Sequence, residues 1–432
     1  MAEETIDRRS GWQPRPRPEW LRRVNEEGAH LDAKAVVPLD ERSLLDSARQ
    51  NTGLDDFGDE SGDDAWREPF QILLRSLEEE ADLNFWGRVY TRSDLVIHLE
   101  ARLRITDWFK RHPEVDEEEI REPVFVTGLP RSGTTIMQEI LGADPGSRVV
   151  KMWEAKFPCP PPAPGDPVPD PRIARADALA TMQDRMTPEW AAMHKVGGEL
   201  PVECIEFTYA SFLSDAFSAS FQVPSYSAYV AQSDQSYAFW WHRRVLKLLQ
   251  STGRPDRWLL KGPTHLPVLP TLFETYPDAK IVLMLRDPVK ALASVVDVCG
   301  TLFWMRGDQP FSGDSYGHFL SVEPVVANLE RLIGWLETGA IPRERVVPVR
   351  YLEFFADPAS QLEALYLGLG IPLTPEAHRC MQDYLASKPK GKFGEHDYDT
   401  GGEALIAEER ARFRHFQDYF GVESEVGSPV GA

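Results

Sequence analysis

The segment at residues 128–135 has the residue types of an anion-binding turn. It reads Gly-Leu-Pro-Arg-Ser-Gly-Thr-Thr, and it separates an apolar stretch from a helical pattern. A glycine turn that enters a helix presents unpaired backbone N–H groups and the positive end of the helix dipole. Gly128 and Gly133 have P-loop spacing, but Thr134 stands where a lysine contacts the β- and γ-phosphates of a triphosphate. The segment therefore predicts binding of a 5′-phosphate group without a triphosphate tail, with Arg131 supplying positive charge.

Arg286 and Ser294 have the spacing of a second anion site. Arg286-Asp287-Pro288 follows another apolar stretch, and Ser294 comes eight residues after the arginine. Asp287 can cap the next helix, and Pro288 suits its first position. Alone, this pattern is at least as typical of a helix cap beside an exposed arginine as it is of an anion site. Because ligands of open α/β sheets bind at the carboxyl ends of strands, the two sites together predict a nucleotide phosphorylated at both its 5′ and 3′ positions.

Lys261 and His265 are the candidate catalytic pair. They lie in the turn Lys-Gly-Pro-Thr-His, which follows a further apolar stretch. Histidine accepts protons near neutral pH, and fixed cations stabilise charge that develops during group transfer. We therefore expect His265 to act as a base toward an acceptor hydroxyl, with Lys261 and Arg131 as the stabilising cations. The alternative for His265 is a helix-capping or core-satisfied side chain.

Four short apolar stretches are spaced as in an α/β protein. Each is followed by a polar or glycine-containing turn and then by a helical pattern. They cover residues 124–127, 258–260, 281–285 and 346–349. The alternation predicts a central, mainly parallel sheet flanked by helices.

The remaining chain predicts additional regions around this α/β domain of residues 121–400. Residues 1–62 are polar and turn-rich, which indicates an extended or partly ordered arm. Apolar residues at helical spacing predict a helical region at 63–120. Residues 150–256 predict a helical insertion on the acceptor side. Residues 401–432 predict a polar helix and a tail.

Composition narrows the functional classes. The chain has 68 acidic and 47 basic residues, a net charge of −21, which argues against a nucleic-acid partner. Its four cysteines show no CxxC pair and no metal-ligand spacing, so we expect free thiols and no zinc site. We find no signal-peptide pattern and no apolar run near the ~20 residues that span a bilayer, and therefore expect a cytoplasmic protein without a transmembrane segment. The oligomeric state is not readable from these features.

With these three segments, at residues 128–135, 261–265 and 286–294, the chain resembles the sulfotransferase family that uses 3′-phosphoadenosine 5′-phosphosulfate (PAPS), particularly its bacterial branch. The family's 3′-phosphate site pairs an arginine with a serine as Arg286 and Ser294 do. Its catalytic Lys-Thr-His-Leu-Pro segment is similar to residues 261–267, with two extra residues here between lysine and histidine. Its 5′-phosphosulfate loop is similar to Pro130, Arg131, Ser132, Gly133, Thr134 and Thr135.

Two later segments extend the resemblance, which covers residues 123–398. Tyr351 begins a stretch similar to the family's adenine-side motif. A late basic-glycine loop that closes over the 3′-phosphate is similar to Lys390, Gly391 and Lys392, followed by His396 and Tyr398. A solvated lysine-glycine loop is the alternative. The resemblance implies a P-loop NTPase-like three-layer α/β fold with an N-terminal helical extension.

The resemblance also implies the activity. A sulfuryl group would pass in line from PAPS to the hydroxyl or amine of a small-molecule acceptor, releasing 3′,5′-adenosine bisphosphate. No metal is expected, since fixed cations would do what magnesium does in triphosphate enzymes. Glu154 competes with His265 as the base, because some bacterial relatives are thought to use a carboxylate. Its alternative is a structural hydrogen-bond acceptor.

Two other functions and two interpretations of the acceptor side stay open. A P-loop kinase would need the missing lysine, and a non-catalytic nucleotide-binding protein would keep both phosphate sites without transfer. The insertion is rich in aromatic residues, which suits an apolar or aromatic alcohol but is equally typical of helix core. These residues are Phe207, Phe212, Phe217, Phe221, Tyr226, Tyr229, Trp240 and Trp241.

Overall fold

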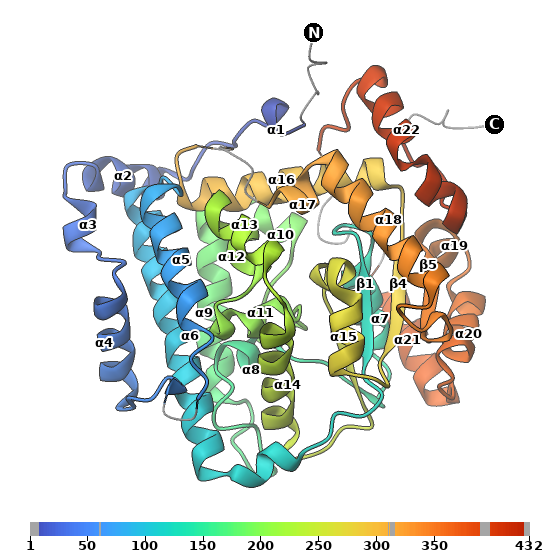
Figure 1. Cartoon of the computed structure of the whole chain (residues 1–432), viewed down its shortest axis with the longest axis horizontal. Helices are drawn as coiled ribbons and strands as arrows, with labels where there is room; N and C mark the ends of the chain where they lie inside the picture. Colours follow the sequence, from blue (N-terminus) through green and yellow to red (C-terminus); the bar gives the residue numbers. More distant parts are fainter. Residues whose placement is uncertain (1–7, 60–61, 310, 312–315, 389–397, 427–432) are drawn as a thin grey trace.

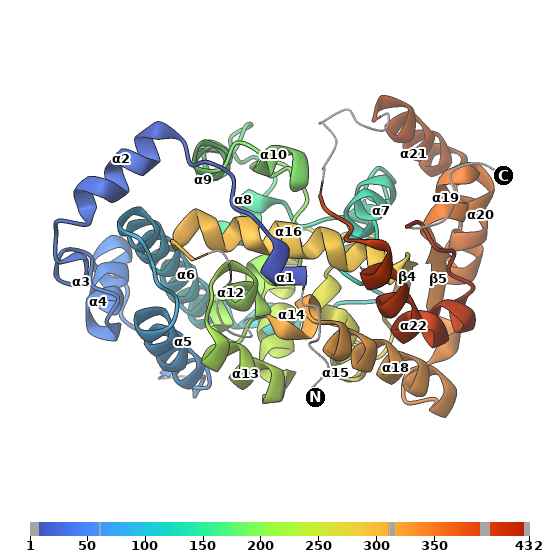
Figure 2. The same ribbon diagram turned by 90° about the horizontal axis from the view of Figure 1, so that it is seen from above.

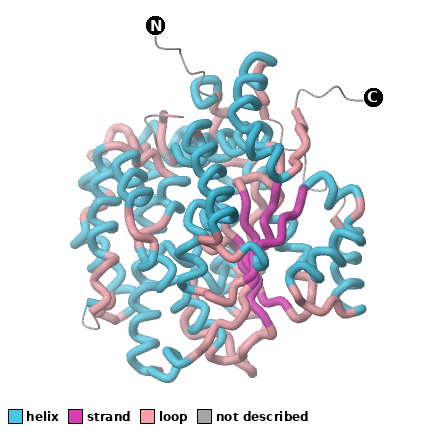
Figure 3. The backbone as a smooth tube through the Cα atoms, turned by 45° about the vertical axis from the view of Figure 1, so that its right-hand side comes forward, coloured by secondary structure: helices cyan, strands magenta, loops and turns pink. Residues whose placement is uncertain are grey.

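A five-stranded sheet forms the centre of the α/β part, and all of its neighbouring strands are parallel (Figure 3). The computed structural model describes residues 8–59, 62–309, 311, 316–388 and 398–426. The strand order is β2-β3-β1-β4-β5. The strands are β1 (Val124–Gly128), β2 (Ser147–Arg148), β3 (Arg257–Lys261), β4 (Lys280–Leu285) and β5 (Val346–Arg350). The four predicted strands are confirmed, whereas the two-residue edge strand β2 has no apolar run and was not predicted.

Helices surround the sheet and extend the molecule to one side (Figure 1). The N-terminal helices are α1 (Arg8–Gly11), α2 (Glu19–Gly28), α3 (Ala33–Val36), α4 (Glu41–Thr52), α5 (Arg67–Glu79) and α6 (Phe85–Arg111). Between β2 and β3 lie α8 (Met152–Lys156), α9 (Pro171–Met186), α10 (Trp190–Met193), α11 (Ile205–Thr208), α12 (Asp215–Ser220), α13 (Pro224–Gln232) and α14 (Ser236–Gln250). The others are α7 (Thr134–Leu141), α15 (Leu269–Thr275), α16 (Pro288–Arg306), α17 (Gly317–Leu320), α18 (Val322–Thr338), α19 (Tyr351–Ala356), α20 (Pro358–Leu369), α21 (Pro375–Ser387) and α22 (Glu403–Phe420). Short 3₁₀ turns are η2 (Pro113–Glu117), η3 (Tyr209–Ser211), η4 (Pro263–Val268) and η5 (Arg343–Arg345).

Alternate side chains of each strand pack into different cores. Phe125 of β1 belongs to a core with α14, α15, α16 and α18, whereas Val124 and Val126 pack with α7, α20 and α21. This is the two-residue period of a strand that is buried on both faces. The result is the expected three-layer arrangement, and the turns after β1, β3 and β4 emerge together at one edge of the sheet.

The polar N-terminal segment is more ordered than we expected. Its described part contains α1 to α4, so helices occupy much of the segment that we expected to be an extended or partly ordered arm. Asp32 and Asp40 cap α3 and α4 by accepting hydrogen bonds from backbone N–H groups. Leu44 and Leu45 of α4 are buried in a core shared with Leu99 of α6. A narrow apolar face is enough to stabilise α4, because this helix packs against α6.

Residues 12–17 have no regular secondary structure, and they lie along α16. Trp12 Nε1 donates a 2.7 Å hydrogen bond to Asp297 Oδ1, and the Arg17 guanidinium lies 3.7 Å from the ring centre of Trp304. A Cβ at Gly300 would lie 2.6 Å from the Trp12 ring, so glycine is needed for this close approach. The segment is a packed part of the α/β domain.

α16 is apolar and long enough to cross a membrane by length and composition alone, contrary to our expectation. However, 78% of its apolar window is buried within the protein. Figure 2 shows the helix crossing from the N-terminal helices toward the sheet. Core packing therefore accounts for its composition.

Arg102 of α6 provides a test of how the helical region is held together. Its side chain is fully buried, with its guanidinium 4.8 Å and 4.6 Å from the ring centres of Trp66 and Trp241. It donates to Asp63 Oδ2 at 2.5 Å and to the Ala210 carbonyl at 3.0 Å. Arg102→Met leaves these acceptors unpaired, so we expect the free energy of unfolding to fall by about 3–5 kcal/mol.

Chemical denaturation of the purified protein measures this loss. The matched control is Arg121→Met, because Arg121 and Glu119 form an ion pair whose side chains are 68% and 63% exposed. We expect the control to unfold at the wild-type denaturant concentration. Equal stability of the two variants would show that the Arg102 contacts do not hold the region together.

Candidate active site

The turn at residues 128–135, called the phosphate loop below, has a backbone that its glycines leave accessible to a ligand. Gly128 and Gly133 have φ values of +149° and +95°, in the region that favours glycine. A Cβ at Gly128 would lie 2.4 Å from the Met284 carbonyl oxygen, and one at Gly133 would lie 2.7 Å from the Tyr351 ring. The loop runs directly into α7, whose first N–H groups have no partner within the helix. The loop therefore has the backbone of an anion cradle.

The residues predicted to bind the donor lie together around this loop. Arg131 Nε donates to Ser294 Oγ at 3.0 Å, and Arg286 Nη1 donates to the Arg131 carbonyl at 3.0 Å. The Arg286 guanidinium lies 4.1 Å from the ring centre of Tyr351. Arg286 and Ser294 are therefore connected through Arg131, which also donates from Nη1 to the Met193 carbonyl at 2.9 Å.

The C-terminal segment contacts the same arginine. Arg286 Nε and Nη2 donate to the two carboxylate oxygens of Glu425 at 2.8 Å and 2.9 Å. The Glu425 backbone N–H donates to Asp287 Oδ2 at 2.7 Å, and Lys290 Nζ lies 3.2 Å from Glu425 Oε2. Burial disfavours the ionised form of Glu425, but Arg286 and Lys290 outweigh that effect and lower its pKa. The Glu425 carboxylate thus accepts hydrogen bonds from two of the three guanidinium nitrogens of Arg286.

Lys261 links the phosphate loop to a carboxylate that sequence analysis missed. Val126 of β1 is paired with Lys261 of β3, which brings the end of β3 beside the start of the loop. Lys261 Nζ lies 2.5 Å from Glu203 Oε1 and donates to Thr135 Oγ1 at 3.2 Å. Burial alone would raise the pKa of Glu203, but Lys261 and His194 outweigh it and lower that pKa. Glu203 is therefore held as an ionised carboxylate beside the loop.

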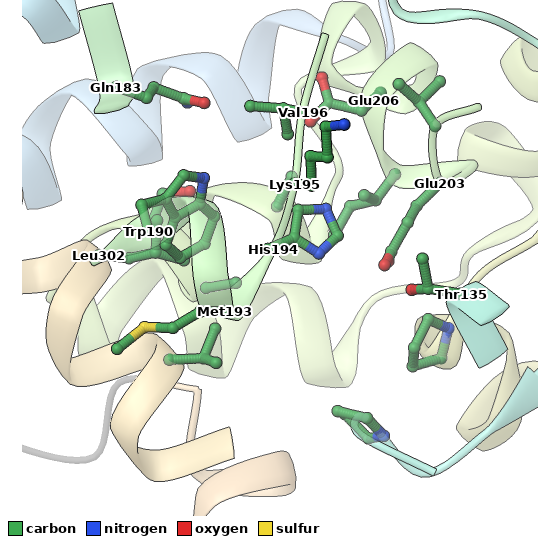
Figure 4. Close-up of a pocket in the computed structure, with 18 of the residues that line it drawn as sticks. Thr135, Gln183, Trp190, Met193, His194, Lys195, Val196, Glu203, Glu206 and Leu302 are labelled. Carbon is green, nitrogen blue, oxygen red and sulfur yellow. The ribbon is translucent and has the colours of Figure 1, made fainter. Parts of the chain in front are cut away.

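A cavity of about 460 Å³ opens from these residues toward the inserted helices. Pro130, Arg131, Thr134, Thr135 and Arg286 are among its lining residues. Figure 4 shows the Glu203 carboxylate directed toward Thr135, with His194 beside it and Trp190, Met193 and Leu302 further along the wall. The phosphate loop and Glu203 thus face one shared space.

The far side of the cavity is apolar but contains buried charges. Lys156 Nζ lies 2.8 Å from Glu206 Oε2, and Arg306 Nη2 lies 3.6 Å from Asp94 Oδ2. Burial raises the pKa of Asp94 despite Arg306, whereas Glu206 and Asp94 raise the pKa of Lys156 against the effect of burial. Polar groups therefore stand at fixed points in an otherwise hydrophobic wall, which suits an amphipathic ligand.

Histidine is poorly placed to serve as the base in this cavity. Burial and the charges of Lys261 and Arg131 lower the pKa of His194 to about 4. His265 is fully enclosed, its ring centre lies 5.3 Å from that of Phe125, and burial lowers its pKa to about 4. Among the described residues His265 is not part of the cavity lining, whereas its neighbours Pro263 and Thr264 are. Its position does not support the predicted role in proton transfer.

Glu154 is a structural hydrogen-bond acceptor, which was the alternative to its role as the base. Glu154 Oε2 accepts a 2.9 Å hydrogen bond from the Lys151 backbone N–H, and Oε1 accepts one of 2.8 Å from Arg148 Nη2. Both oxygens are therefore occupied in stabilising the start of α8, and the residue does not line the cavity.

The aromatic residues of the insertion divide between core and cavity. Phe217 and Phe221 line the cavity, as does Tyr209, which was not singled out. Phe207, Phe212, Tyr226 and Trp241 are buried in helix cores, and Trp240 is 38% exposed. The apolar-acceptor interpretation therefore fits only part of the set.

Some predicted site residues lie outside the described residues, and two acidic residues that line the cavity were not predicted. Lys390, Gly391, Lys392 and His396 lie outside the described residues, while Tyr398 lies close enough to Arg131 and Arg286 to affect both of their pKa values. Glu203 and Glu206 were missed although they are acidic residues in a strongly apolar segment, which is the signal that could have found them.

Comparison with known proteins identifies the family of this chain. The family described as "Sulfotransferase family" matches residues 123–375, more than half of the chain. Omega-hydroxy-beta-dihydromenaquinone-9 sulfotransferase Stf3 of Mycobacterium bovis is 24% identical over 308 residues, which cover 67% of this chain and 71% of that protein.

Solved structures extend the likeness to the N-terminal helices. Sulfotransferase STF1 of Mycobacterium tuberculosis is 29% identical with a TM-score of 0.73, covering 87% of this chain and 98% of that one. Sulfotransferase STF9 of Mycobacterium avium is 24% identical with a TM-score of 0.76, covering 89% and 97%, and it shows the same fold. With its phosphate loop, parallel sheet and matched residues 123–375, the chain belongs to the sulfotransferase family.

Proposed function

We propose that the protein transfers the sulfuryl group of PAPS to a hydroxyl group of an apolar small molecule and releases 3′,5′-adenosine bisphosphate. The observation that carries this proposal is the connection from Thr135 through Lys261 to Glu203. It joins the end of the phosphate loop to an ionised carboxylate that lines the apolar cavity. Donor and acceptor groups would therefore meet beside one proton acceptor.

The donor would bind through the loop and its neighbours. The backbone N–H groups of residues 131–135 and the side chain of Arg131 would hold the 5′-phosphosulfate. Arg286 and Tyr351 would bind the 3′-phosphate and the nucleoside, assisted by Ser294 and by the loop of Lys390, Gly391 and Lys392. This arrangement uses fixed cations, so we propose transfer without a catalytic metal.

Glu203 is our candidate for the base, in place of His265. The acceptor oxygen forms a bond to sulfur while the bond from sulfur to the 5′-phosphate oxygen breaks, and the acceptor proton passes to the Glu203 carboxylate. Glu203 Oε1 pairs with Lys261, which leaves the other carboxylate oxygen to accept this proton. Lys261 lies between Glu203 and Thr135 and would stabilise charge near the leaving phosphate.

The cavity favours an amphipathic acceptor. Leu95, Phe217, Phe221 and Leu302 supply apolar wall, and a cavity of about 460 Å³ is in the range of pockets that hold small molecules. The curated relative named for a hydroxylated menaquinone derivative points in the same direction. We therefore propose a hydrophobic alcohol or phenol as the acceptor class.

A radiolabel assay tests the function directly. The purified protein is incubated with PAPS that carries ³⁵S and with a panel of alcohols and phenols of increasing apolar length. We expect label in an organic-extractable product and an equal amount of 3′,5′-adenosine bisphosphate. Binding of the bisphosphate by the protein, without transfer of label to any acceptor, would instead support the non-catalytic alternative. Transfer of phosphate from ATP would support a kinase.

A further inference from the structure

Three potential metal ligands from separate segments meet behind the active site. Cys204 precedes α11, His242 lies in α14, and His265 lies in the η4 turn. Their ligand atoms lie within 4.8 Å of one another, and all three residues are buried. Because they are separated by 38 and 23 residues in the chain, no motif spacing could have indicated the cluster.

Both histidines have a ring nitrogen without a hydrogen-bond partner in the described part of the chain. Nε2 of His242 and Nε2 of His265 are buried without a hydrogen bond from any described residue. A buried polar atom is normally satisfied, so two such atoms in one cluster need an explanation. His242 Nδ1 lies 2.6 Å from the Tyr276 hydroxyl, an interaction that leaves Nε2 as the ligand atom. Metal-binding histidines commonly have such a second hydrogen bond, which fixes the orientation of the ring.

The space and the chemistry suit an ion. A small cavity of about 50 Å³ is lined by all three residues and by Asp215. Bonds of about 2.0–2.3 Å place the ligand atoms of a tetrahedral zinc site roughly 3.3–3.8 Å apart, so a contraction of about 1 Å closes the cluster. Burial holds both imidazoles neutral by lowering their pKa values, which is the state that ligates metal.

We propose that Cys204, His242 and His265 bind one thiophilic d¹⁰ ion, Zn²⁺ or Cu⁺. A thiolate with two imidazoles is a ligand set for both ions. Binding releases the Cys204 thiol proton, and the thiolate balances the charge of Cu⁺ fully and that of Zn²⁺ in part. Zn²⁺ has room in the cavity for water as a fourth ligand.

The ion would hold together the two segments that carry the candidate catalytic pair. Cys204 follows Glu203 directly, and its backbone N–H donates to the Lys261 carbonyl at 2.7 Å. His265 is in the turn that begins after Lys261. The ion is therefore a positioning element outside the cavity lining, and it takes no part in the transfer step.

Metal titration of the full-length protein tests this site. The chelator-treated protein is titrated separately with Zn²⁺ and Cu⁺ against competing chromophoric chelators, and with Co²⁺ as an optical probe. We expect one equivalent bound per chain, a thiolate-to-cobalt charge-transfer band, and an affinity at least 100-fold weaker in Cys204→Ser.

Cys299→Ser is the matched control, since Cys299 is also a buried free thiol. This variant should bind like the wild type. Equal affinity of the wild type and Cys204→Ser, or wild-type protein without the cobalt band, would overturn the proposal. The optical band needs no variant, so it decides the question even if Cys204→Ser does not fold.

Discussion

Replacement of Glu203 by glutamine should lower turnover by roughly 10²–10⁴-fold, the contribution typical of a general base. Glutamine keeps the size of the side chain and can still accept a hydrogen bond from Lys261, but it cannot take the acceptor's proton. The bisphosphate product should bind with near wild-type affinity, because the Glu203 side chain pairs with Lys261 whereas Arg286 pairs with Glu425. Steady-state turnover with saturating PAPS, together with calorimetry, measures both quantities.

Glu154→Gln is the matched control for this experiment. Glu154 is also a buried glutamate paired with a basic side chain, Arg148, but it lies outside the cavity lining. We expect this control to retain turnover within a few-fold of wild type. Near-normal turnover of Glu203→Gln, with a large loss in a folded His265→Gln variant, would return the role of base to His265.

Substitutions of Arg286 and Glu425 should change donor-site affinity in opposite directions. Arg286→Ala removes charge-assisted hydrogen bonds to the 3′-phosphate, each worth about 1.5–3 kcal/mol, so the Kd of the bisphosphate should rise about 10- to 150-fold. Glu425 holds the same guanidinium through two hydrogen bonds and competes with that phosphate. Glu425→Gln should therefore tighten binding, by about 5-fold if the ion pair is worth about 1 kcal/mol.

Isothermal calorimetry with 3′,5′-adenosine bisphosphate and with 5′-AMP separates the two effects. Both substitutions should leave 5′-AMP affinity almost unchanged, because that ligand lacks the 3′-phosphate. Weaker bisphosphate binding in Glu425→Gln would instead mean that Glu425 orients Arg286 for the phosphate. An equal loss of 5′-AMP affinity in Arg286→Ala would place Arg286 on the 5′ side.

Local signals were sufficient to predict the sheet and the grouping of Arg131 with Arg286 at its edge. Each long strand is an apolar run, and glycine, proline and arginine residues indicate the turns after β1 and β4. In a parallel sheet these turns must emerge at one edge, so Arg131, Gly133 and Arg286 could be grouped before the structure was known.

The acceptor side depends on long-range contacts that the sequence does not reveal. Within the insertion, Pro201 forms an isolated antiparallel bridge with Lys151, and the Cys204 backbone N–H donates to the Lys261 carbonyl, so Glu203 is held beside the end of β3. His265 lies outside the lining of the cavity, and spacing alone cannot tell which way a side chain in a 3₁₀ turn points. Of the N-terminal helices, those before residue 63 were not predicted individually, because packing of α4 against α6 makes a short apolar face sufficient.

The most direct test of the account is a calorimetric titration with 3′,5′-adenosine bisphosphate, 5′-AMP and ATP in magnesium-free buffer. We predict that the bisphosphate binds tightest, that 5′-AMP binds more weakly, and that Arg286→Ala removes most of the difference between them. Preferential binding of ATP that requires added magnesium would contradict the assignment of PAPS as the donor.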